Sequence, residues 1–313
     1  MAEFDSPTTI EALSTTLAGL GHVVERIGHI RDLAARLVAG ERWDLVFNIA
    51  EGLAGRAREA QVPALLDAYG IPYTFSDPLV MAVCLDKAVA KRLVAAAGIP
   101  TARHAVIETA ADAEAVDLAF PLFVKPVAEG TGKGCELASI VGDRDGLKNA
   151  ALALVARFAQ PALVETYLPG REFTIGVLGN GDEAQVVAVM EIELLPNAEP
   201  GVYSWLNKEE CESRVRYALA DDATAREAAA VALAAYHALE CRDACRIDIR
   251  CDGAGRPHFI EANPLAGLHP THSDLPMLAA AAGMAYPELI GTIVAAAARR
   301  WGLLDARAVG RAA

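Results

Sequence analysis

The chain has 313 residues, 53% apolar and 22% charged, so it can hold two or three compact units and is too apolar to be disordered. Its net charge of −13 argues against a protein that binds nucleic acid through phosphates, whose surface should be basic. The six cysteines include no CxxC pair, and the three between 241 and 251 fit no common zinc spacing, which indicates a reduced, cytoplasmic protein. The acidic start of the chain lacks the apolar segment of a signal peptide. The most apolar stretch, 278–298, is interrupted by Gly283, Pro287 and Glu288, which favours two core helices over a membrane span.

The first third of the chain alternates predicted helices with short apolar segments. The expected elements are a helix over 8–20, a buried strand over 44–49, a helix over 60–69, an extended segment over 70–74 and a helix over 86–97. This αβαβ order is typical of a small parallel-sheet unit. The last of these helices is followed by Gly98 and Pro100, a regular C-terminal stop.

The remaining two thirds predict a mixture of strands and helices. The expected elements are strands over 120–126, 134–141 and 162–168, a helix over 144–158, paired strands over 172–178 and 184–195, and a helix over 223–239. A Pro169-Gly170 break lies between the two groups of strands. We therefore place domain boundaries near residues 85 and 170, which gives units of 1–85, 86–170 and 171–313.

Two strands near the C-terminus, 245–251 and 258–263, carry the most informative pattern. The Gly-rich segment between them is typical of a hairpin turn. Because side chains alternate faces along a strand, matching apolar residues sets a register. The apolar face then pairs Ile249 with Ile260 and Ile247 with Ala262, and the other face pairs Asp248 with Glu261 and Arg246 with Asn263.

The polar face of this hairpin predicts a metal site. Two carboxylates directly across a ladder, here Asp248 and Glu261, repel each other and destabilise the sheet unless a hard cation lies between them. Carboxylate oxygens with the Asn263 carbonyl suit Mg²⁺, which commonly leaves its other positions to phosphates and water. We interpret the face as a nucleotide-metal site with Arg246 beside it. The alternative is a surface hairpin with scattered charges.

Two further segments favour a nucleotide. A buried strand ends on Lys125 and is followed by a glycine loop over 129–134, so a point charge and backbone N–H groups can hold a triphosphate together. The loop is not a Walker A motif, whose lysine follows it, and a plain glycine-rich turn is the alternative. Further on, exposed backbone over 163–168 can read an adenine edge, and Glu172 can accept from ribose hydroxyls, although single acids are more often just solvated.

Together these segments resemble the ATP-grasp superfamily, and specifically its D-alanine–D-alanine ligase branch. The resemblance runs from about Thr8 to Arg300. The residues that carry it are Phe47-Asn48, Ile71-Pro72-Tyr73-Thr74, Leu85-Asp86-Lys87, Gly98-Ile99-Pro100, Val124-Lys125-Pro126, Glu129-Gly130, Val164-Glu165, Glu172-Phe173-Thr174, Arg246-Ile247-Asp248, Glu261-Ala262-Asn263, His272-Ser273 and Gly283-Met284-Ala285-Tyr286.

The resemblance implies a role for each matching position. For the ATP phosphates, it implies contacts from Lys87 and Lys125 and from the loop residues Glu129, Gly130 and Thr131. For the nucleoside, it implies an adenine site framed by Glu165, Tyr167 and Leu168, and a ribose contact from Glu172. For metal, it implies two Mg²⁺ ions, with Mn²⁺ as a substitute, held by Asp248, Glu261 and Asn263. For catalysis, it implies Arg246 at the tetrahedral intermediate, Ser273 at the carboxylate of the amine-donating amino acid, and Lys208 near the γ-phosphate.

The chain departs from the family pattern around the first substrate and the lid. Residues 48–59 stand where the family has a His-Gly pair followed by a Gly-Glu-Asp-Gly run. Glu209 replaces the tyrosine of the family's flexible lid loop, and Thr131-Gly132-Lys133 replaces the Ser-Ser-Val of its glycine loop. These differences put D-alanine in the first subsite in question.

The start of the chain also differs from the family, which opens with a strand and a glycine-rich turn that carries an acid. Seven residues, including Pro7, are too few to supply these. Either the true start lies upstream, or the sheet lacks that strand and Glu3 or Asp5 replaces the acid. We favour the first, because a missing strand would expose apolar sheet edge over 46–49.

These observations predict an α/β and α+β protein with the ATP-grasp fold and an N-terminal parallel-sheet domain. The expected activity is an ATP- and Mg²⁺-dependent carboxylate–amine ligase that joins two amino acids, D-alanine with D-alanine first. The alternatives are a ligase for another pair, as in secondary metabolism, and a regulatory protein that binds ATP without turnover. The expected partners are small amino-acid substrates, with no nucleic acid and no membrane, and a homodimer is compatible with the sequence.

Overall fold

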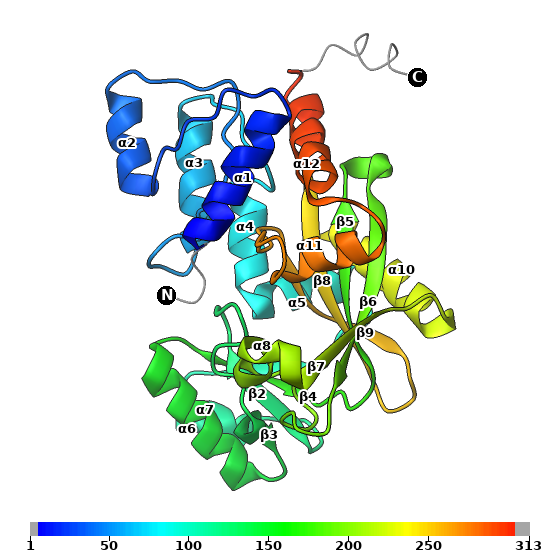
Figure 1. The fold of residues 1–313 in the computed structure, drawn as a ribbon. Helices are drawn as coiled ribbons and strands as arrows, with labels where there is room; N and C mark the ends of the chain where they lie inside the picture. The colour runs from blue at the N-terminus through cyan, green and yellow to red at the C-terminus, as the bar shows by residue number, and fades with distance from the viewer. Residues whose placement is uncertain (1–5, 304–313) are drawn as a thin grey trace.

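The computed structural model describes residues 6–303, and Figure 1 shows three groups of elements. The N-terminal group contains α1 (Pro7–Gly19), α2 (Ile30–Val38), a short 3₁₀ turn (Arg58–Ala60), α3 (Gln61–Ala68) and α4 (Pro78–Leu85). Ser6 caps α1 and Asp77 caps α4, each by accepting a backbone N–H of the first turn, and a proline opens both helices. The helices predicted over 8–20 and 60–69 are therefore confirmed.

The strand predicted over 44–49 is present only as a single bridge. Val46 pairs with Tyr73 in parallel, through the Val46 N–H to Pro72 O (2.8 Å) and the Thr74 N–H to Val46 O (3.0 Å). Within the described residues no further strand extends this pair into a sheet. Val46 is nonetheless buried, and Phe47 and Ile49 are partly buried, although no neighbouring strand covers them. Glu3 and Asp5 lie outside the described residues.

The central group is built on a four-stranded antiparallel sheet of order β1-β4-β2-β3. Its strands are β1 (His104–Ile107), β2 (Leu122–Pro126), β3 (Ile140–Val141) and β4 (Ala162–Thr166), and its helices are α5 (Lys87–Ala96), α6 (Ala110–Ala115) and α7 (Arg144–Phe158). The strand predicted over 134–141 is wrong except for its last two residues. The preceding loop turns through positive φ at Thr131, Gly132 and Gly134, which no strand adopts.

The C-terminal group is a five-stranded antiparallel sheet of order β7-β6-β5-β8-β9. Its strands are β5 (Glu172–Leu178), β6 (Gln185–Leu194), β7 (Val215–Leu219), β8 (Ala244–Cys251) and β9 (Pro257–Asn263), and its helices are α8 (Trp205–Glu209), α9 (Cys211–Arg214), α10 (Ala223–Ala238), α11 (Asp274–Ala281) and α12 (Tyr286–Arg300). Helix α10 packs on one face of this sheet, and α11 with α12 packs on the other.

The hairpin register is confirmed at three pairs and wrong at the fourth. Arg246 faces Asn263, Ile247 faces Ala262, and Asp248 faces Glu261, as predicted. A register shift between Asp248 and Ile249 then places Ile249 opposite Phe259 instead of Ile260. Phe259 is fully buried in the core, whereas Ile260 lines a cavity. The larger ring takes the core position, and the irregularity turns Ile260 to the other side.

The apolar C-terminal stretch forms two core helices, as predicted. Among residues 6–303 no single helix is long and apolar enough to cross a membrane; α11 and α12 together reach that length and composition but are bent by 113° at their break. Beyond them, Arg300 joins the N- and C-terminal groups, since its Nη2 donates to Tyr73 O (3.0 Å), Phe75 O (3.0 Å) and the buried Asp243 carboxylate (2.7 Å). Each cysteine has a free thiol, and Cys251 is fully buried in the core as predicted.

Candidate active site

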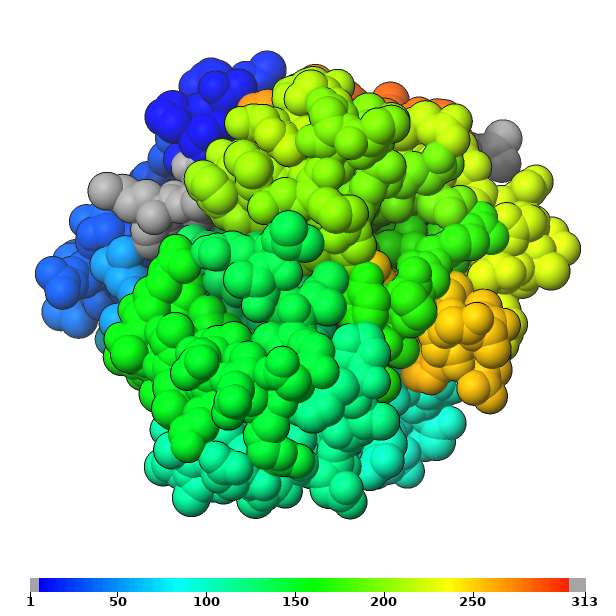
Figure 2. Space-filling model, turned by 90° about the horizontal axis from the view of Figure 1, so that it is seen from below, coloured from blue at the N-terminus to red at the C-terminus, as the bar shows by residue number. Residues whose placement is uncertain are grey.

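Two adjoining cavities lie where the three groups of elements meet. The first lies between the central sheet and the C-terminal sheet, and the second lies between the N-terminal group, the α8–α9 segment and the loop after β9. The residues that line both are Lys87, Glu129, Tyr203, Lys208 and Glu261. The segment that leads to α8 closes against the central group, since Tyr167 Oη donates to Gly201 O (2.8 Å) and the Trp205 N–H donates to Cys135 O (3.2 Å). Figure 2 shows the green and yellow-green surfaces of these parts in contact.

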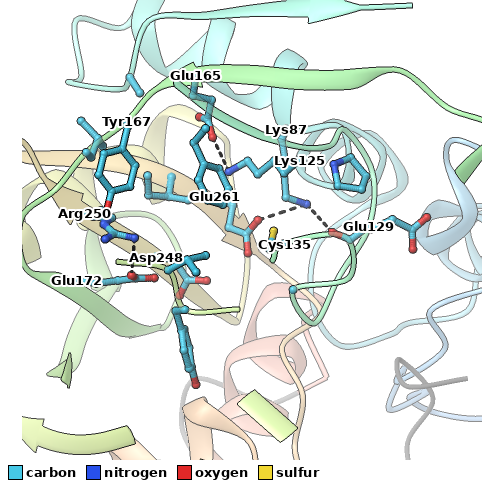
Figure 3. A pocket seen from close by; sticks show the side chains of 18 of the residues that line it. Lys87, Lys125, Glu129, Cys135, Glu165, Tyr167, Glu172, Asp248, Arg250 and Glu261 are labelled. Atoms are coloured by element: carbon cyan, nitrogen blue, oxygen red, sulfur yellow. Dashed lines mark hydrogen bonds and ion pairs between the residues drawn. The ribbon is translucent and has the colours of Figure 1, made fainter. Parts of the chain in front are cut away.

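A buried group of lysines and glutamates forms one wall of the first cavity (Figure 3). Lys125 leaves β2 and lies 2.7 Å from Glu165 Oε2 on β4, because the two strands are neighbours in the sheet. Lys91, one helical turn after Lys87 on α5, approaches the other oxygen of Glu165 at 2.5 Å and is fully buried. The carboxylate of Glu165 is therefore shared by two ammonium groups.

Their mutual pairing shifts the pKa of each group. Burial alone would raise the pKa of Glu165, but Lys125 and Lys91 lower it to about 2. Burial acts to lower the pKa of Lys125, and Glu165 and Glu261 reverse this, so the pKa of Lys125 is raised. The pKa of Lys91 stays lowered by burial, although Glu165 opposes the shift. Lys125 therefore remains a cation in the cavity at every physiological pH.

Lys87 begins α5 and connects the glycine loop to the hairpin. Asp86 caps this helix by accepting the Val89 N–H (3.0 Å). Lys87 Nζ donates to Glu129 O (2.6 Å) and lies 3.3 Å from Glu261 Oε2. The single ammonium group thus faces both cavities at once.

The far end of the first cavity is formed by Tyr167, Glu172 and Arg250 (Figure 3). Arg250 Nη1 lies 3.1 Å from Glu172 Oε2, its Nη2 donates to Gly201 O (2.8 Å), and its guanidinium lies 5.4 Å from the ring centroid of Tyr167. An aromatic ring, an arginine and an acid at this end suit a heterocyclic base and a sugar hydroxyl.

The hairpin residues meet at the boundary between the cavities. Arg246 lies 3.1 Å from Asp248 Oδ2 and 3.3 Å from Asp274 Oδ2, and Thr174 Oγ1 donates to Asp248 Oδ1 (2.9 Å). Burial raises the pKa of Asp248, and the Glu261 charge adds to the shift against the opposing effect of Arg246. Burial would also raise the pKa of Glu261, but Lys87 and Lys125 lower it.

These residues fit a hard divalent cation. Asp248 and Glu261 face each other across the ladder, so their charges repel, and a cation between them removes the cost. The Asn263 Nδ2 donates to Asp248 Oδ2 (3.4 Å), so the Asn263 amide lies beside this pair of carboxylates. Two carboxylates and an amide oxygen are ligands that Mg²⁺ accepts.

Ser273 stands at the N-cap position of α11 but makes no side-chain cap bond, so capping of this helix does not account for its hydroxyl. Its Oγ instead accepts the His269 N–H (3.0 Å), which leaves the hydroxyl hydrogen free to donate into the second cavity. Gly267 permits this arrangement, because a Cβ there would lie 2.8 Å from Ser273 Oγ.

Every site residue predicted from the sequence lines one of the two cavities. The first is lined by Lys125, Glu165, Tyr167, Leu168, Glu172 and Asp248, the second by Gly130, Thr131, Arg246, Asn263 and Ser273, and both by Lys87, Glu129, Lys208 and Glu261. Gly130 and Thr131 thus face the second cavity rather than the first. The side chain of Glu165 is committed to Lys91 and Lys125, so any contact with adenine falls to its backbone.

Sequence reasoning missed several residues of the site. Lys91 was detectable, because it follows Lys87 by four positions on a predicted helix and so shares its face. Arg250 continues the alternation of Arg246 and Asp248 along β8, which also predicts its face. Tyr203 and Asp274 gave no such signal, because tertiary packing alone brings them to the cavities.

Comparisons with known proteins agree with this geometry. A family model described as the D-ala D-ala ligase C-terminus matches residues 93–295. A D-alanine–D-alanine ligase from Gluconobacter oxydans is 35% identical over 295 residues, which cover 93% of each chain. An uncharacterized protein from Sinorhizobium fredii is 35% identical over 265 residues, 82% of this chain and 75% of that one.

Solved structures show the same fold. The ATP complex of the Bacillus anthracis D-alanine–D-alanine ligase superposes with a TM-score of 0.73 over 96% of each chain, at 22% identity. The D-Ala:D-Ser ligase VanG from Enterococcus faecalis gives 0.66 at 25% identity, over 81% of this chain and 73% of that one. The matching model, the long alignment and the shared fold establish that this chain belongs to the D-alanine–D-alanine ligase family of ATP-grasp enzymes.

Proposed function

We propose that the protein joins two amino acids in an ATP- and Mg²⁺-dependent reaction that passes through an acyl phosphate. The main support for the proposal is the position of Lys87 and Glu261, because each of these residues lines both the first and the second cavity. A γ-phosphate bound beside them lies next to an amino acid in the second cavity. Transfer of this phosphate to a carboxylate needs charge neutralisation and alignment, and no protein nucleophile.

We assign ATP to the first cavity. Lys87 and Lys125 are the cations that face the phosphates, with Glu129 and the loop beside it. Tyr167 and Leu168 frame the base, and Glu172 accepts from the ribose, with Arg250 holding its carboxylate at 3.1 Å. We also keep the predicted division into three domains near residues 85 and 170, with this cavity between the second and the third.

We assign the metal to the hairpin. Asp248, Glu261 and Asn263 would hold Mg²⁺, which supplies neutralisation of phosphate charge when bound. Thr174 and Arg246 both donate to the Asp248 carboxylate and so fix its orientation.

Arg246 and Ser273 act on the substrates in the second cavity. The guanidinium of Arg246 is fixed by Asp248 and Asp274, so it is a preorganised donor for the oxyanion that develops when the amine attacks. Ser273 donates its hydroxyl hydrogen to the carboxylate of the amine-donating amino acid. Lys208, which lines both cavities, compensates charge on the transferred phosphate.

D-alanine with D-alanine is the first candidate pair, because two relatives that are each 35% identical to this chain are D-alanine–D-alanine ligases. A different pair is the second candidate. It is favoured by Glu209, which lines the second cavity at the position of the family's lid tyrosine, so the wall that meets the substrate differs here.

Release of ADP from ATP and Mg²⁺ in the presence of single and paired L- and D-amino acids tests the proposal. We expect release that requires an amino acid, with dipeptide formed in equal amount. ATP binding by calorimetry without ADP release from any pair would refute a ligase and support the ATP-binding regulatory protein.

A further inference from the structure

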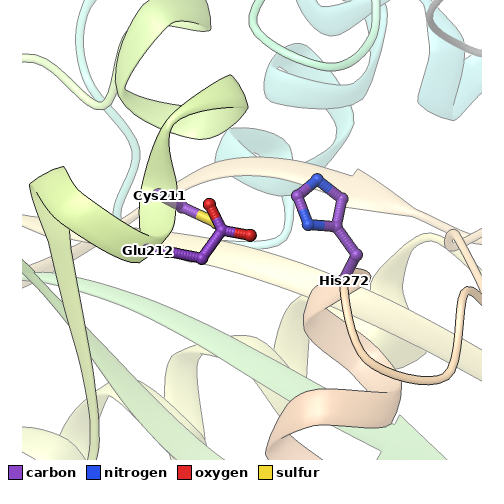
Figure 4. A group of neighbouring side chains, drawn as sticks. All are labelled: Cys211, Glu212 and His272. Atoms are coloured by element: carbon purple, nitrogen blue, oxygen red, sulfur yellow. The ribbon is translucent and has the colours of Figure 1, made fainter.

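A second cluster of potential metal ligands lies at the rim of the second cavity, apart from the hairpin acids. Cys211 and Glu212 open α9, and His272 lies in the loop before α11 (Figure 4). A sulfur, a carboxylate oxygen and a ring nitrogen from these residues all lie within 4.8 Å of one another. Cys211 and His272 also line the second cavity.

The donor types differ from those of the hairpin. A thiolate and an imidazole prefer borderline or soft cations such as Zn²⁺ and Co²⁺, whereas Mg²⁺ prefers oxygen. Three protein ligands with one open position are a known arrangement for Zn²⁺. The Cys–Glu–His set therefore suits an ion of the Zn²⁺ class and discriminates against the Mg²⁺ that the hairpin takes.

The surroundings suit a bound ion. Glu212 and His272 are exposed, so an ion can enter from solvent, whereas Cys211 is buried behind them. Binding of the ion would release the thiol proton to solvent.

We propose that Cys211, Glu212 and His272 form a binding site for one transition-metal ion of the Zn²⁺ class. The ion links α9, which follows Lys208 and Glu209, to the loop that carries Ser273. Because both segments line the second cavity, the ion fixes the distance between them. Ion binding at this site does not require the proposed ligase reaction.

Titration with Co²⁺ in the presence of excess Mg²⁺ tests the proposal on the intact protein, with absorption as the readout. We expect one Co²⁺ per chain and a thiolate-to-Co²⁺ charge-transfer band. Replacement of a residue that only supports a metal ligand typically lowers metal affinity by roughly 10–100-fold, and replacement of a ligand itself should lower it at least as much. Cys211→Ser should therefore abolish the band, and His272→Ala should weaken binding by about 100-fold or more.

Matched controls separate this site from others. Glu212→Gln should weaken binding, whereas Glu210→Gln should not, because Glu210 pairs with Arg214 instead (2.7 Å). Asp248→Asn should keep the band, since it alters only the hairpin. Absence of the band in the wild-type protein would overturn the proposal, as would a band that persists in Cys211→Ser. Neither result depends on ligase turnover.

Discussion

Glu165 is the residue whose replacement gives the sharpest test of the lysine–glutamate wall. Its two oxygens lie 2.5 Å from Lys91 and 2.7 Å from Lys125. Glu165→Gln keeps the shape but removes the charge, so two buried ammonium groups lose their shared counterion. Lys91 keeps hydrogen bonds to Thr101 Oγ1 (2.9 Å) and Phe259 O (3.1 Å), which are neutral.

The expected loss of stability can be worked out in two ways. The two lysines lower the pKa of Glu165 from 4.5 to about 2. At about 1.4 kcal/mol per pKa unit, this shift corresponds to roughly 3 kcal/mol of folding free energy at neutral pH. Removal of one partner from a buried ion pair typically costs about 3–5 kcal/mol. We therefore expect Glu165→Gln to lower the free energy of unfolding by about 3 kcal/mol.

Urea unfolding of the nucleotide-free protein at pH 7 measures this loss. Glu114→Gln is the matched control, because Glu114 pairs with Lys148 at 3.0 Å on the surface, where solvent screens the charges, so its loss should leave the free energy of unfolding nearly unchanged. A loss of under about 1 kcal/mol in Glu165→Gln would refute the reasoning, since it would mean that the buried charges need no counterion.

The pH dependence of the same difference gives a second check. A carboxylate whose folded pKa is lowered stabilises the protein fully above its unfolded pKa, and this stabilisation is lost as the pH falls through the folded pKa. For Glu165 the window runs from about pH 4.5 down to about 2. The stability gap between wild type and Glu165→Gln should shrink by about 1 kcal/mol between pH 7 and pH 3.5.

Three further substitutions test the assigned roles. Glu261→Gln should abolish Mg²⁺-dependent ADP release in a folded protein, and unchanged ADP release would contradict the metal assignment. Urea unfolding should show no gain in stability, because relief of the repulsion with Asp248 is offset by loss of the ion pair to Lys87 (3.3 Å). Arg246→Ala should lower kcat by about 10²–10³ with a modest change in ATP affinity, so loss of ATP binding by calorimetry with kcat spared would show the role to be wrong. Ser273→Ala should raise KM for the amine-donating amino acid by roughly 10-fold or more and leave KM for ATP nearly constant, because a hydrogen bond to a charged group is lost; equal changes in both would argue against the assignment.

The hairpin shows how far the sequence pattern determines structure. Alternation places Asp248 and Glu261 on one face and Ile247 and Ala262 on the other, because a shift by one residue would bury both acids. The pattern fails where two apolar residues are adjacent. Phe259 and Ile260 both suit the core, and side-chain volume rather than polarity decides between them.

Short and edge elements were harder to predict. Strand β1 has four residues and β7 has five, too few for a periodic signal, and both are edge strands that their sheets position. The loop before β3 contains apolar residues that resembled a strand, yet glycines at positive φ direct it toward the α8 segment. A Cβ at Gly132 would lie 3.3 Å from the Trp205 backbone nitrogen, so contact between segments far apart in the chain decides this conformation.

The ion pairs around the first cavity explain why so many charges are tolerated there. In the structure Glu165 is paired with Lys91 and Lys125, and Glu261 is paired with Lys87, so none of the three buried lysines lacks an acidic neighbour. A triphosphate bound as proposed would bring its own negative charge to Lys87 and Lys125, and Mg²⁺ would take Glu261. Glu165 has no such alternative use, because its two oxygens are paired with Lys91 and Lys125. We therefore infer that Glu165 is the permanent counterion of this wall, and that Glu261 is the acid that changes partner when nucleotide binds.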